Sequence, residues 1–224
     1  MEKIKLNKGL IAIGSSKGEG KTRFSLKLAN YIAQNENVLF ISYTTYKEKL
    51  ISNIIEIDGF INEKLDINTS FSYWGTEVFL DIIKYVKTNK ISTIFLDDIE
   101  NFCGYNGNKD DTIKDLKYLS ELLDIKLVFS TNLIRLDSIE YSNYEGSMIT
   151  IVNYKPNLKE FKWSHRLIND CTQIIGLYRP SYNGFTEDAD GNSSYDRIEI
   201  YYLKNNENEN NIYILSNKKE NLYN

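Results

Sequence analysis

Histidine and cysteine are scarce in this chain. His165 is the only histidine, and Cys103 and Cys171 are the only cysteines, among 224 residues. A single histidine argues against a histidine-rich metal site and against a Ser-His-Asp hydrolase. Two cysteines are too few for a disulfide framework, and they fit a pair of reduced, structural thiols in a cytosolic protein.

The sequence also lacks a long apolar run and an excess of positive charge. No stretch approaches the roughly 20 apolar residues of a membrane-spanning helix, and residues 1–5 lead into a short strand instead of a signal-peptide core. Lys and Arg number 27 against 31 Asp and Glu, a net charge of −4. The chain therefore does not coat nucleic acid by charge alone, and any such contact needs a local basic patch or a channel made by several subunits. We expect a cytoplasmic protein that makes no membrane contact.

Short apolar runs alternate with helical patterns in the first part of the chain. Four runs have the composition of buried parallel strands, at residues 9–14, 38–42, 93–96 and 127–130. Apolar residues spaced three and four apart predict helices from about residue 20 and at 46–54, 77–86 and 112–123. Because strand and helix alternate, we expect an α/β fold with a mostly parallel central sheet flanked by helices.

The last third of the chain has a different pattern. Strands are predicted at 148–152, 173–178, 197–203 and 212–215, with few helices between them. Residues 204–211 are nearly all Asn and Glu, which indicates a hairpin loop between the last two strands. No internal repeat and no linker divides the sequence. We therefore expect a single domain with an antiparallel β extension at its C-terminal end.

A glycine-containing turn joins the first predicted strand to the first predicted helix. Residues 15–22 read Ser-Ser-Lys-Gly-Glu-Gly-Lys-Thr, and this context is that of a Walker A phosphate loop. Small residues let backbone N–H groups surround a phosphate, and the helix N-terminus adds its positive dipole end. Lys21 would contact the β- and γ-phosphates, and the Thr22 hydroxyl would bind Mg²⁺. The standard motif has glycine where this chain has Ser15, with Gly14 one place early. A glycine turn without a ligand is the alternative interpretation.

The third predicted strand ends in two carboxylates. Asp97 follows the apolar run without a gap, so we expect it, before Asp98, to act as the Walker B residue that holds the magnesium ion with Thr22. A helix N-cap is the alternative role of such a residue. The expected cofactors are ATP or another nucleoside triphosphate, and Mg²⁺. The residues expected to bind the nucleotide are Ser16, Lys17, Gly18, Glu19, Gly20, Lys21, Thr22 and Arg23.

Several segments together match one known family. They are residues 15–26, 38–42, 47–50, 95–98 and 127–130, and above all 174–184, Ile-Ile-Gly-Leu-Tyr-Arg-Pro-Ser-Tyr-Asn-Gly, with an acidic turn at 187–191. With these segments the chain resembles the C-terminal, RecA-like motor domain of DnaB-type replicative helicases, as a divergent, stand-alone member. The resemblance implies a RecA-like P-loop fold and a nucleotide site between subunits of a ring or filament. It also implies action on single-stranded DNA in replication, and we expect a phage or another mobile element as the source.

The resemblance further implies two DNA-contacting loops, at 101–111 and 134–166. The second holds a basic and aromatic cluster, which suits phosphate neutralisation and base stacking. A solvated loop with a hydrophobic anchor is the alternative. The cluster consists of Lys155, Lys159, Phe161, Lys162, Trp163 and Arg166. The chain would then divide into a P-loop core at 1–135 and a DNA-loop region with the C-terminal strands at 136–224. Arg179 and Lys204 would be further nucleotide contacts.

Three departures from the family concern catalysis. The catalytic glutamate after the second strand is matched by Thr44, which cannot act as a general base. In the Lys-x-Arg turn that carries the arginine finger, Lys204 matches the lysine but Asn206 replaces the arginine. The polar sensor after the fourth strand falls on Thr131 or Asn132, and neither is the usual residue. These departures predict weakened or absent hydrolysis.

Three functions therefore remain open. The chain is an ATPase or helicase acting on single-stranded DNA, a non-hydrolysing nucleotide-binding regulator or adaptor of an active helicase, or, with less support, a P-loop kinase of a small molecule. The kinase leaves the segment at 174–184 unexplained. Asp98 and Glu100 are the acidic residues that could replace the missing base.

Overall fold

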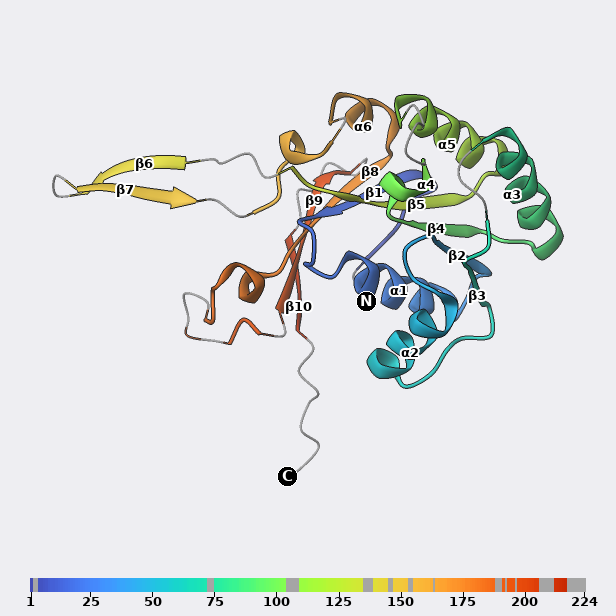
Figure 1. Ribbon diagram of the computed structural model, residues 1–224, viewed down its shortest axis with the longest axis horizontal. Helices are drawn as coiled ribbons and strands as arrows, with labels where there is room; N and C mark the ends of the chain where they lie inside the picture. Colours follow the sequence, from blue (N-terminus) through green and yellow to red (C-terminus); the bar gives the residue numbers. More distant parts are fainter. Residues whose placement is uncertain are drawn as a thin grey trace.

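An eight-stranded sheet forms the centre of the protein (Figure 1). The computed structural model describes residues 1, 4–71, 75–103, 109–134, 139–144, 147–152, 155–162, 164–187, 191, 193–195, 197–205 and 212–216. The strand order is β10-β9-β8-β1-β5-β4-β2-β3. The strands from β8 to β3 are parallel to one another. β9 pairs antiparallel with β8, and β10 pairs antiparallel with β9. The strands are β1 (Gly9–Ser15), β2 (Val38–Ser42), β3 (Leu65–Asn68), β4 (Thr93–Asp97), β5 (Lys126–Asn132), β8 (Gln173–Tyr178), β9 (Arg197–Lys204) and β10 (Ile212–Ser216).

Helices cover both faces of this sheet, as Figure 1 shows. One face packs against α1 (Lys21–Ile32) and α2 (Lys47–Asp58), and the other against α3 (Thr76–Asn89), α5 (Lys109–Leu123) and α6 (Ser164–Asp170). Successive side chains of a strand point to opposite faces. In β1, Ile11 and Ile13 therefore belong to the core on the α1 side, and Leu10 and Ala12 to the core on the α5 side. The continuous apolar runs of the sequence thus reflect burial of both faces.

The predicted α/β fold with an antiparallel C-terminal extension is confirmed. Seven of the eight predicted strands lie in the central sheet. The prediction missed β3, which has only four residues, alternates buried and half-buried side chains, and lies at the sheet edge. It also missed the short helix α4 (Ile99–Phe102), which follows the Walker B strand directly and occupies the start of the expected loop at 101–111. Residues 104–108 of that loop lie outside the described part.

The eighth predicted strand lies outside the central sheet. Residues 148–152 belong to β7 (Ser147–Val152), which pairs with β6 (Ile139–Tyr144) as a separate two-stranded ribbon that projects from the body in Figure 1. The segment at 134–166 is therefore not one loop: it contains this ribbon, the 3₁₀ turn η1 (Leu158–Glu160) and the first residues of α6. The polar composition of β6 concealed its strand from an analysis of apolar runs.

Neither a membrane-spanning helix nor a disulfide is found among the described residues. No helix there has the length and apolar character needed to cross a membrane. Cys103 and Cys171 are both buried and form no disulfide, and burial raises the pKa of the Cys171 thiol well above its usual value. Both thiols therefore belong to the core.

Candidate nucleotide-binding site

The loop between β1 and α1 takes the form that a phosphate loop requires. Gly18 and Gly20 have φ values of 89° and 92°, a region that residues with a Cβ rarely enter. Gly20 is the residue before α1, and the first turn of that helix carries no acidic side chain. The positive end of the helix dipole therefore faces the loop, and no acidic side chain of the helix's own first turn neutralises it.

Lys21 lies inside the loop and is 9% exposed. Its Nζ atom donates hydrogen bonds to Ser15 O at 3.0 Å, Ser16 O at 3.2 Å and Asn132 Oδ1 at 2.9 Å, and lies 3.3 Å from Ser15 Oγ. Burial lowers the pKa of Lys21, and the surrounding carboxylates, Glu100 foremost, oppose this shift. The lysine is thus a positive charge fixed beside the loop at the end of β5.

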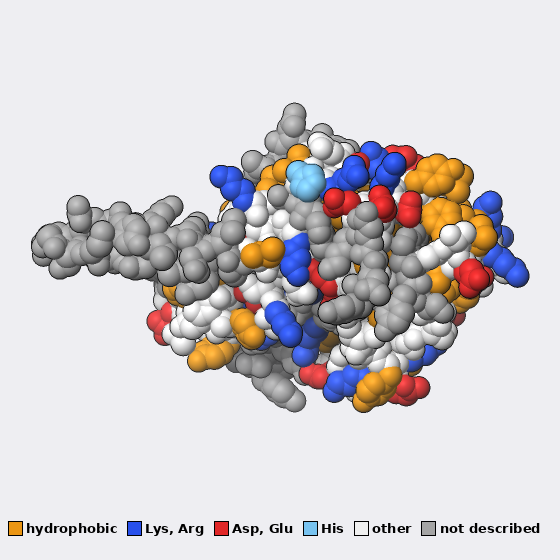
Figure 2. Space-filling view, turned by 45° about the horizontal axis from the view of Figure 1, so that its top comes forward, with side chains coloured by type: hydrophobic (Ala, Val, Ile, Leu, Met, Phe, Trp, Pro, Cys, Tyr) orange, Lys and Arg blue, Asp and Glu red, His pale blue; other side chains and the backbone are white. Residues whose placement is uncertain are grey.

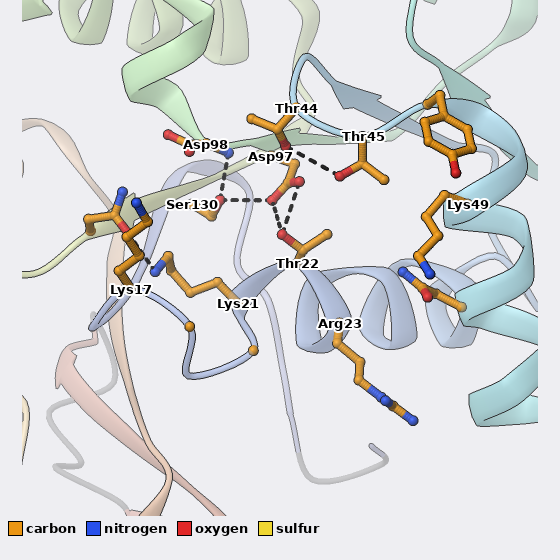
Figure 3. A pocket seen from close by; sticks show the side chains of 15 residues that line it. Lys17, Lys21, Thr22, Arg23, Thr44, Thr45, Lys49, Asp97, Asp98 and Ser130 are labelled. Atoms are coloured by element: carbon orange, nitrogen blue, oxygen red, sulfur yellow. Dashed lines mark hydrogen bonds between the residues drawn. The ribbon is translucent and has the colours of Figure 1, made fainter. Parts of the chain in front are cut away.

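Asp97 is the buried acid at the centre of the site (Figure 3). The Thr22 hydroxyl donates to its two oxygens at 2.9 and 3.1 Å, and the hydroxyls of Ser42 and Ser130 approach at 3.3 and 3.2 Å. Burial raises the pKa of Asp97, and hydrogen bonds from Thr22 and these serines oppose the rise. Of the two acids at the strand end, the geometry therefore favours Asp97 as the partner of Thr22, as the sequence predicted.

The residues around Asp97 fit a magnesium ion. Mg²⁺ takes hard oxygen ligands, and in nucleotide sites it is held by one or two protein groups together with phosphates and water. Thr22 and Asp97 supply a hydroxyl and a carboxylate in direct contact. No group of three or more His, Cys, Asp or Glu side chains placed to hold a metal occurs among the described residues, so a cation bound here would need the phosphates of a nucleotide.

A hollow of about 560 Å³ opens over these groups. Figure 3 shows Lys17, Lys21 and Thr22 on one side and Thr44, Thr45 and Lys49 on another. The lining residues come from the phosphate loop, the ends of β4 and β5, and the segment between β2 and α2. They are Lys17, Gly18, Gly20, Lys21, Thr22, Arg23, Thr44, Thr45, Tyr46, Lys49, Asn53, Asp97, Asp98, Ser130 and Asn132.

The structure separates the two candidates for the polar sensor. Asn132 lines the hollow and accepts the Lys21 hydrogen bond, whereas Thr131 is fully buried and donates to Glu100 Oε1 at 2.8 Å. Consecutive residues of a strand point to opposite sides, so only one of them could face the phosphate loop. Thr131 therefore points away from the hollow, and a sensor role at Asn132 stays a prediction.

Two members of the loop do not line the hollow. Ser16 and Glu19 are absent from its wall, and Glu19 is 1% exposed. Its carboxylate accepts from Ser16 N at 2.9 Å and from Asn183 Nδ2 at 2.9 Å. The Glu19 side chain thus shapes the loop, and a contact of either residue with phosphate through its backbone N–H stays a prediction. Arg23 lines the hollow and pairs with Glu56 of α2 at 3.1 Å.

The segment most typical of the resemblance packs against the phosphate loop. The turn η2 (Pro180–Asn183) follows β8, and its Asn183 reaches Glu19 while the Tyr182 hydroxyl lies against Gly18. Sequence analysis did not assign these two residues to the site. It also missed Ser42 and Ser130, although both lie at the carboxyl ends of strands beside β4, where ligands of parallel sheets bind.

Arg179 and Lys204 lie at opposite ends of the paired strands β8 and β9. Arg179 follows β8 at the edge of the phosphate loop, but it does not line the hollow and its Nη2 atom lies 3.5 Å from Tyr195 O. Lys204 ends β9 opposite Ile174, and its Nζ atom donates to the backbone carbonyls of Ile168, at 2.6 Å, and Cys171. A contact of Lys204 with a nucleotide inside its own chain is therefore excluded, and a contact in a neighbouring subunit stays a prediction. Asn206 lies outside the described residues.

The members of the basic cluster differ in their surroundings. Lys155 and Lys159 are exposed, whereas Lys162 lies 3.8 Å from Glu100 and Arg166 lies 3.6 Å from Asp170. On the face that carries α5 and α6, Figure 2 accordingly shows Lys and Arg side chains beside Asp and Glu side chains. Trp163 lies outside the described residues.

Phe161 is a core residue and cannot stack on a base. It is 2% exposed and packs on Leu133 and Gly14. The alternative of a hydrophobic anchor therefore holds for this aromatic ring. A Cβ atom added to Gly14 would lie 2.5 Å from the Phe161 ring and 2.8 Å from a Leu133 methyl group. Gly14, which precedes the usual glycine position of the motif by one residue, therefore leaves the space in which Phe161 of the basic cluster packs.

We expect Gly14→Ala to lower the free energy of unfolding by about 1–3 kcal/mol, because overpacking a close-packed interior costs this much. Chemical denaturation measures the effect. Gly75→Ala is the matched control, since a Cβ at Gly75 meets no atom within 4 Å and its extended backbone accepts alanine. Equal stability of the two variants would contradict the close approach of Phe161.

Comparison with known proteins gives structural matches alone. No protein-family model matches the sequence, and no curated protein matches it either. Among solved structures, a DnaB-like replicative helicase, described with its interactions with primase, is 17% identical with a TM-score of 0.73; the match covers 94% of this chain and 55% of that chain. A second solved structure, the ATPase domain of another protein, is 17% identical with a TM-score of 0.72, and the match covers 95% of this chain and 82% of that chain.

These matches extend over almost the whole chain, which spans only about half the length of the first protein. At this level of identity they establish the fold. The chain has the RecA-like fold of the ATPase domain of DnaB-type replicative helicases.

Proposed function

We propose that this chain is an ATP-binding protein of the DnaB-helicase type that acts on single-stranded DNA in replication, with weakened hydrolysis. The observation that carries the proposal is the joint position of Lys21, Thr22 and Asp97 at the carboxyl ends of β1 and β4. The packing of Tyr182 and Asn183 against the same loop supports the family, because these residues belong to the segment that carries the resemblance.

The site residues would divide the work of binding. The backbone N–H groups of residues 17, 18 and 20–22 and the Lys21 ammonium would hold the β- and γ-phosphates, whereas the N–H groups of Ser16 and Glu19 donate within the loop. Thr22 and Asp97 would hold Mg²⁺, which neutralises phosphate charge when it is bound. Asn132, already beside Lys21, would lie near the terminal phosphate. A ring or filament would be needed for any arginine finger to enter from a neighbouring chain.

A non-hydrolysing regulator or adaptor of an active helicase is the second candidate. One observation favours it: Thr44, which the resemblance matches to the family's catalytic glutamate, lines the hollow, and a hydroxyl is a poor general base at neutral pH. The Thr44 hydroxyl lies 3.5 Å from the hydroxyls of Ser42 and Thr45. A nucleotide bound here would then act as a conformational signal.

One experiment separates the two candidates. ATP binding is measured by titration, and phosphate release is measured with and without single-stranded DNA on the same preparation. Turnover that rises with DNA supports a minimal motor, whereas tight binding without turnover supports the regulator. Failure to bind any nucleoside triphosphate would contradict both.

The exposed lysines of the basic cluster give a separate prediction. We expect Lys155→Ala combined with Lys159→Ala to weaken binding to single-stranded DNA and to reduce the slope of log affinity against log salt by about 1.4, since each lost phosphate contact removes roughly 0.7. Fluorescence anisotropy at several salt concentrations measures the slope. Lys84→Ala with Lys87→Ala, two exposed lysines of α3, removes the same charge elsewhere. An identical slope in both double variants would contradict a DNA contact at the cluster.

A further inference from the structure

The phosphate loop contains residues that do not hold one conformation by themselves. Gly18 and Gly20 give the loop its form with φ values of 89° and 92°, and glycine loses more conformational freedom on ordering than any other residue. A loop that became ordered only when a nucleotide arrived would lose part of the binding free energy to this cost. Contacts that order the loop beforehand therefore raise the affinity for the nucleotide.

Glu19 closes the loop on itself. Its backbone N–H donates to Ser16 O at 3.3 Å, and Ser16 N donates to Glu19 Oε2 at 2.9 Å. The two residues thus bridge the turn in both directions. Glu19 is buried and does not line the hollow. Because a buried carboxylate is stable only where donors surround it, the conformation of the loop depends on the groups that donate to Glu19.

Asn183 supplies one of these donors from outside the loop. Its Nδ2 atom donates to Glu19 Oε1 at 2.9 Å and to Arg179 O at 3.2 Å. The second bond holds the amide in the turn η2, where the Tyr182 hydroxyl also lies against Gly18. The turn follows β8, which pairs with β1. The loop is therefore tied to the central sheet by a hydrogen bond to a charged group, which is the stronger kind.

The direction of the Glu19 carboxylate also decides whether it opposes an anionic ligand. Burial lowers the pKa of Lys21, and Glu19 is among the carboxylates whose attraction opposes this shift. A Glu19 carboxylate that turned toward Lys21 would compete with phosphate for this cation and would repel the phosphate charge. The bonds from Ser16 N and Asn183 hold the carboxylate away from the hollow.

We propose that Asn183 is a positioning residue for nucleotide binding, which acts through Glu19: it holds the phosphate loop in its ordered form and keeps the Glu19 carboxylate out of the hollow. The inference rests on the proposed function, and it applies to the ATPase and to the regulator alike because it concerns binding. Affinity for the nucleotide thus depends on a residue outside the wall of the hollow, 164 positions from its partner in the loop.

An exchange of the two polar groups tests this role. Asn183→Asp places a second carboxylate against Glu19, and we expect it to raise the Kd for ATP at least about tenfold, because like charges in contact disfavour each other. Adding Glu19→Gln restores the pairing, since the glutamine carbonyl can accept from Ser16 N while its amide donates to the new carboxylate. The double variant should return the Kd to within about threefold of wild type. Titration with ATP measures both values.

Asn89→Asp is the matched control, at the exposed last residue of α3. Asn89 Nδ2 donates to Tyr85 O, four residues earlier, as Asn183 Nδ2 donates to Arg179 O. Both variants lose this local bond, and Asn183→Asp in addition meets Glu19. The control should therefore leave the Kd for ATP unchanged.

Hydrogen exchange of the nucleotide-free proteins separates this role from a general loss of stability. We expect the amides of residues 15–20 to exchange about fivefold faster or more in Asn183→Asp, and at the wild-type rate in the double variant. The amides of β4 and β5 should exchange equally in all three proteins. Exchange that rises throughout the protein, or that does not rise in residues 15–20, overturns the inference.

The affinities decide the rest. A smaller rise in Kd for Asn183→Asp overturns the inference, and so does a double variant that binds ATP no more tightly than Asn183→Asp; both results leave the proposed function in place. If Asn183→Asp does not fold, Asn183→Ala removes the donor without adding charge, with an expected rise of at least about fivefold, and a smaller rise overturns the inference. Wild-type protein that binds no nucleoside triphosphate contradicts the proposed function itself, and this inference with it.

Discussion

Lys21→Ala is expected to raise the Kd for ATP by at least about a hundredfold. Two charge-assisted hydrogen bonds, to the β- and γ-phosphates, contribute about 1.5–3 kcal/mol each to binding. Among the described residues of the hollow, Lys21 is the only cation that is held within the loop, by hydrogen bonds to Ser15 O and Ser16 O. Isothermal titration with ATP measures the change.

The control for this variant is Lys84→Ala, which removes an equal charge from an exposed position of α3. Circular dichroism establishes that both variants keep the fold. Unchanged ATP affinity in Lys21→Ala would contradict the assignment of residues 15–22 as a phosphate loop.

Asp97→Asn is expected to abolish the dependence of ATP affinity on Mg²⁺, and in a protein that hydrolyses ATP to lower phosphate release by at least about a hundredfold. An amide keeps the size of the side chain but lacks the charge that a hard divalent cation requires, and Lewis-acid stabilisation contributes several kcal/mol to phosphoryl transfer. Titrations with and without Mg²⁺ measure the first effect.

The same variant makes a prediction about stability. Burial raises the pKa of Asp97, which means that the protein disfavours its charged form. Asp97→Asn without nucleotide should therefore unfold at a temperature no lower than wild type. Asp81→Asn, the control, should leave both the unfolding temperature and the Mg²⁺ dependence of ATP affinity unchanged. If Mg²⁺ strengthened ATP binding equally in Asp97→Asn and wild type, the metal would be held elsewhere.

Local patterns in the sequence predicted the parts of the candidate nucleotide site that are contiguous in the chain. The apolar runs predicted the buried strands because parallel strands are covered on both faces. The glycines and Lys21-Thr22 predicted the phosphate loop because loop, helix start and lysine lie within eight residues. The choice of Asp97 over Asp98 followed from its place in the apolar run, and the Thr22 hydrogen bond agrees with it.

Contacts between distant residues were not accessible in the same way. Glu19 and Asn183 are 164 positions apart, and their contact depends on β8 pairing with β1. The burial of Phe161 depends on the bridge between Leu133 and Phe161. In the sequence, where this bridge is not visible, Phe161 lies among basic residues and therefore had the pattern of a residue that stacks on bases. Thr131 and Asn132 could be separated only when the orientation of β5 relative to the phosphate loop was known.

The sequence by itself determined the α/β class, and it predicted residues 15–22 as a phosphate loop with Asp97 as its acid, because these follow from periodicity and spacing within short segments. Tertiary structure alone decided which polar groups surround Asp97 and how the segment after β8 packs against the loop. The physical reason is that strand order and side-chain orientation are set by packing of the whole core, and no short segment carries that information.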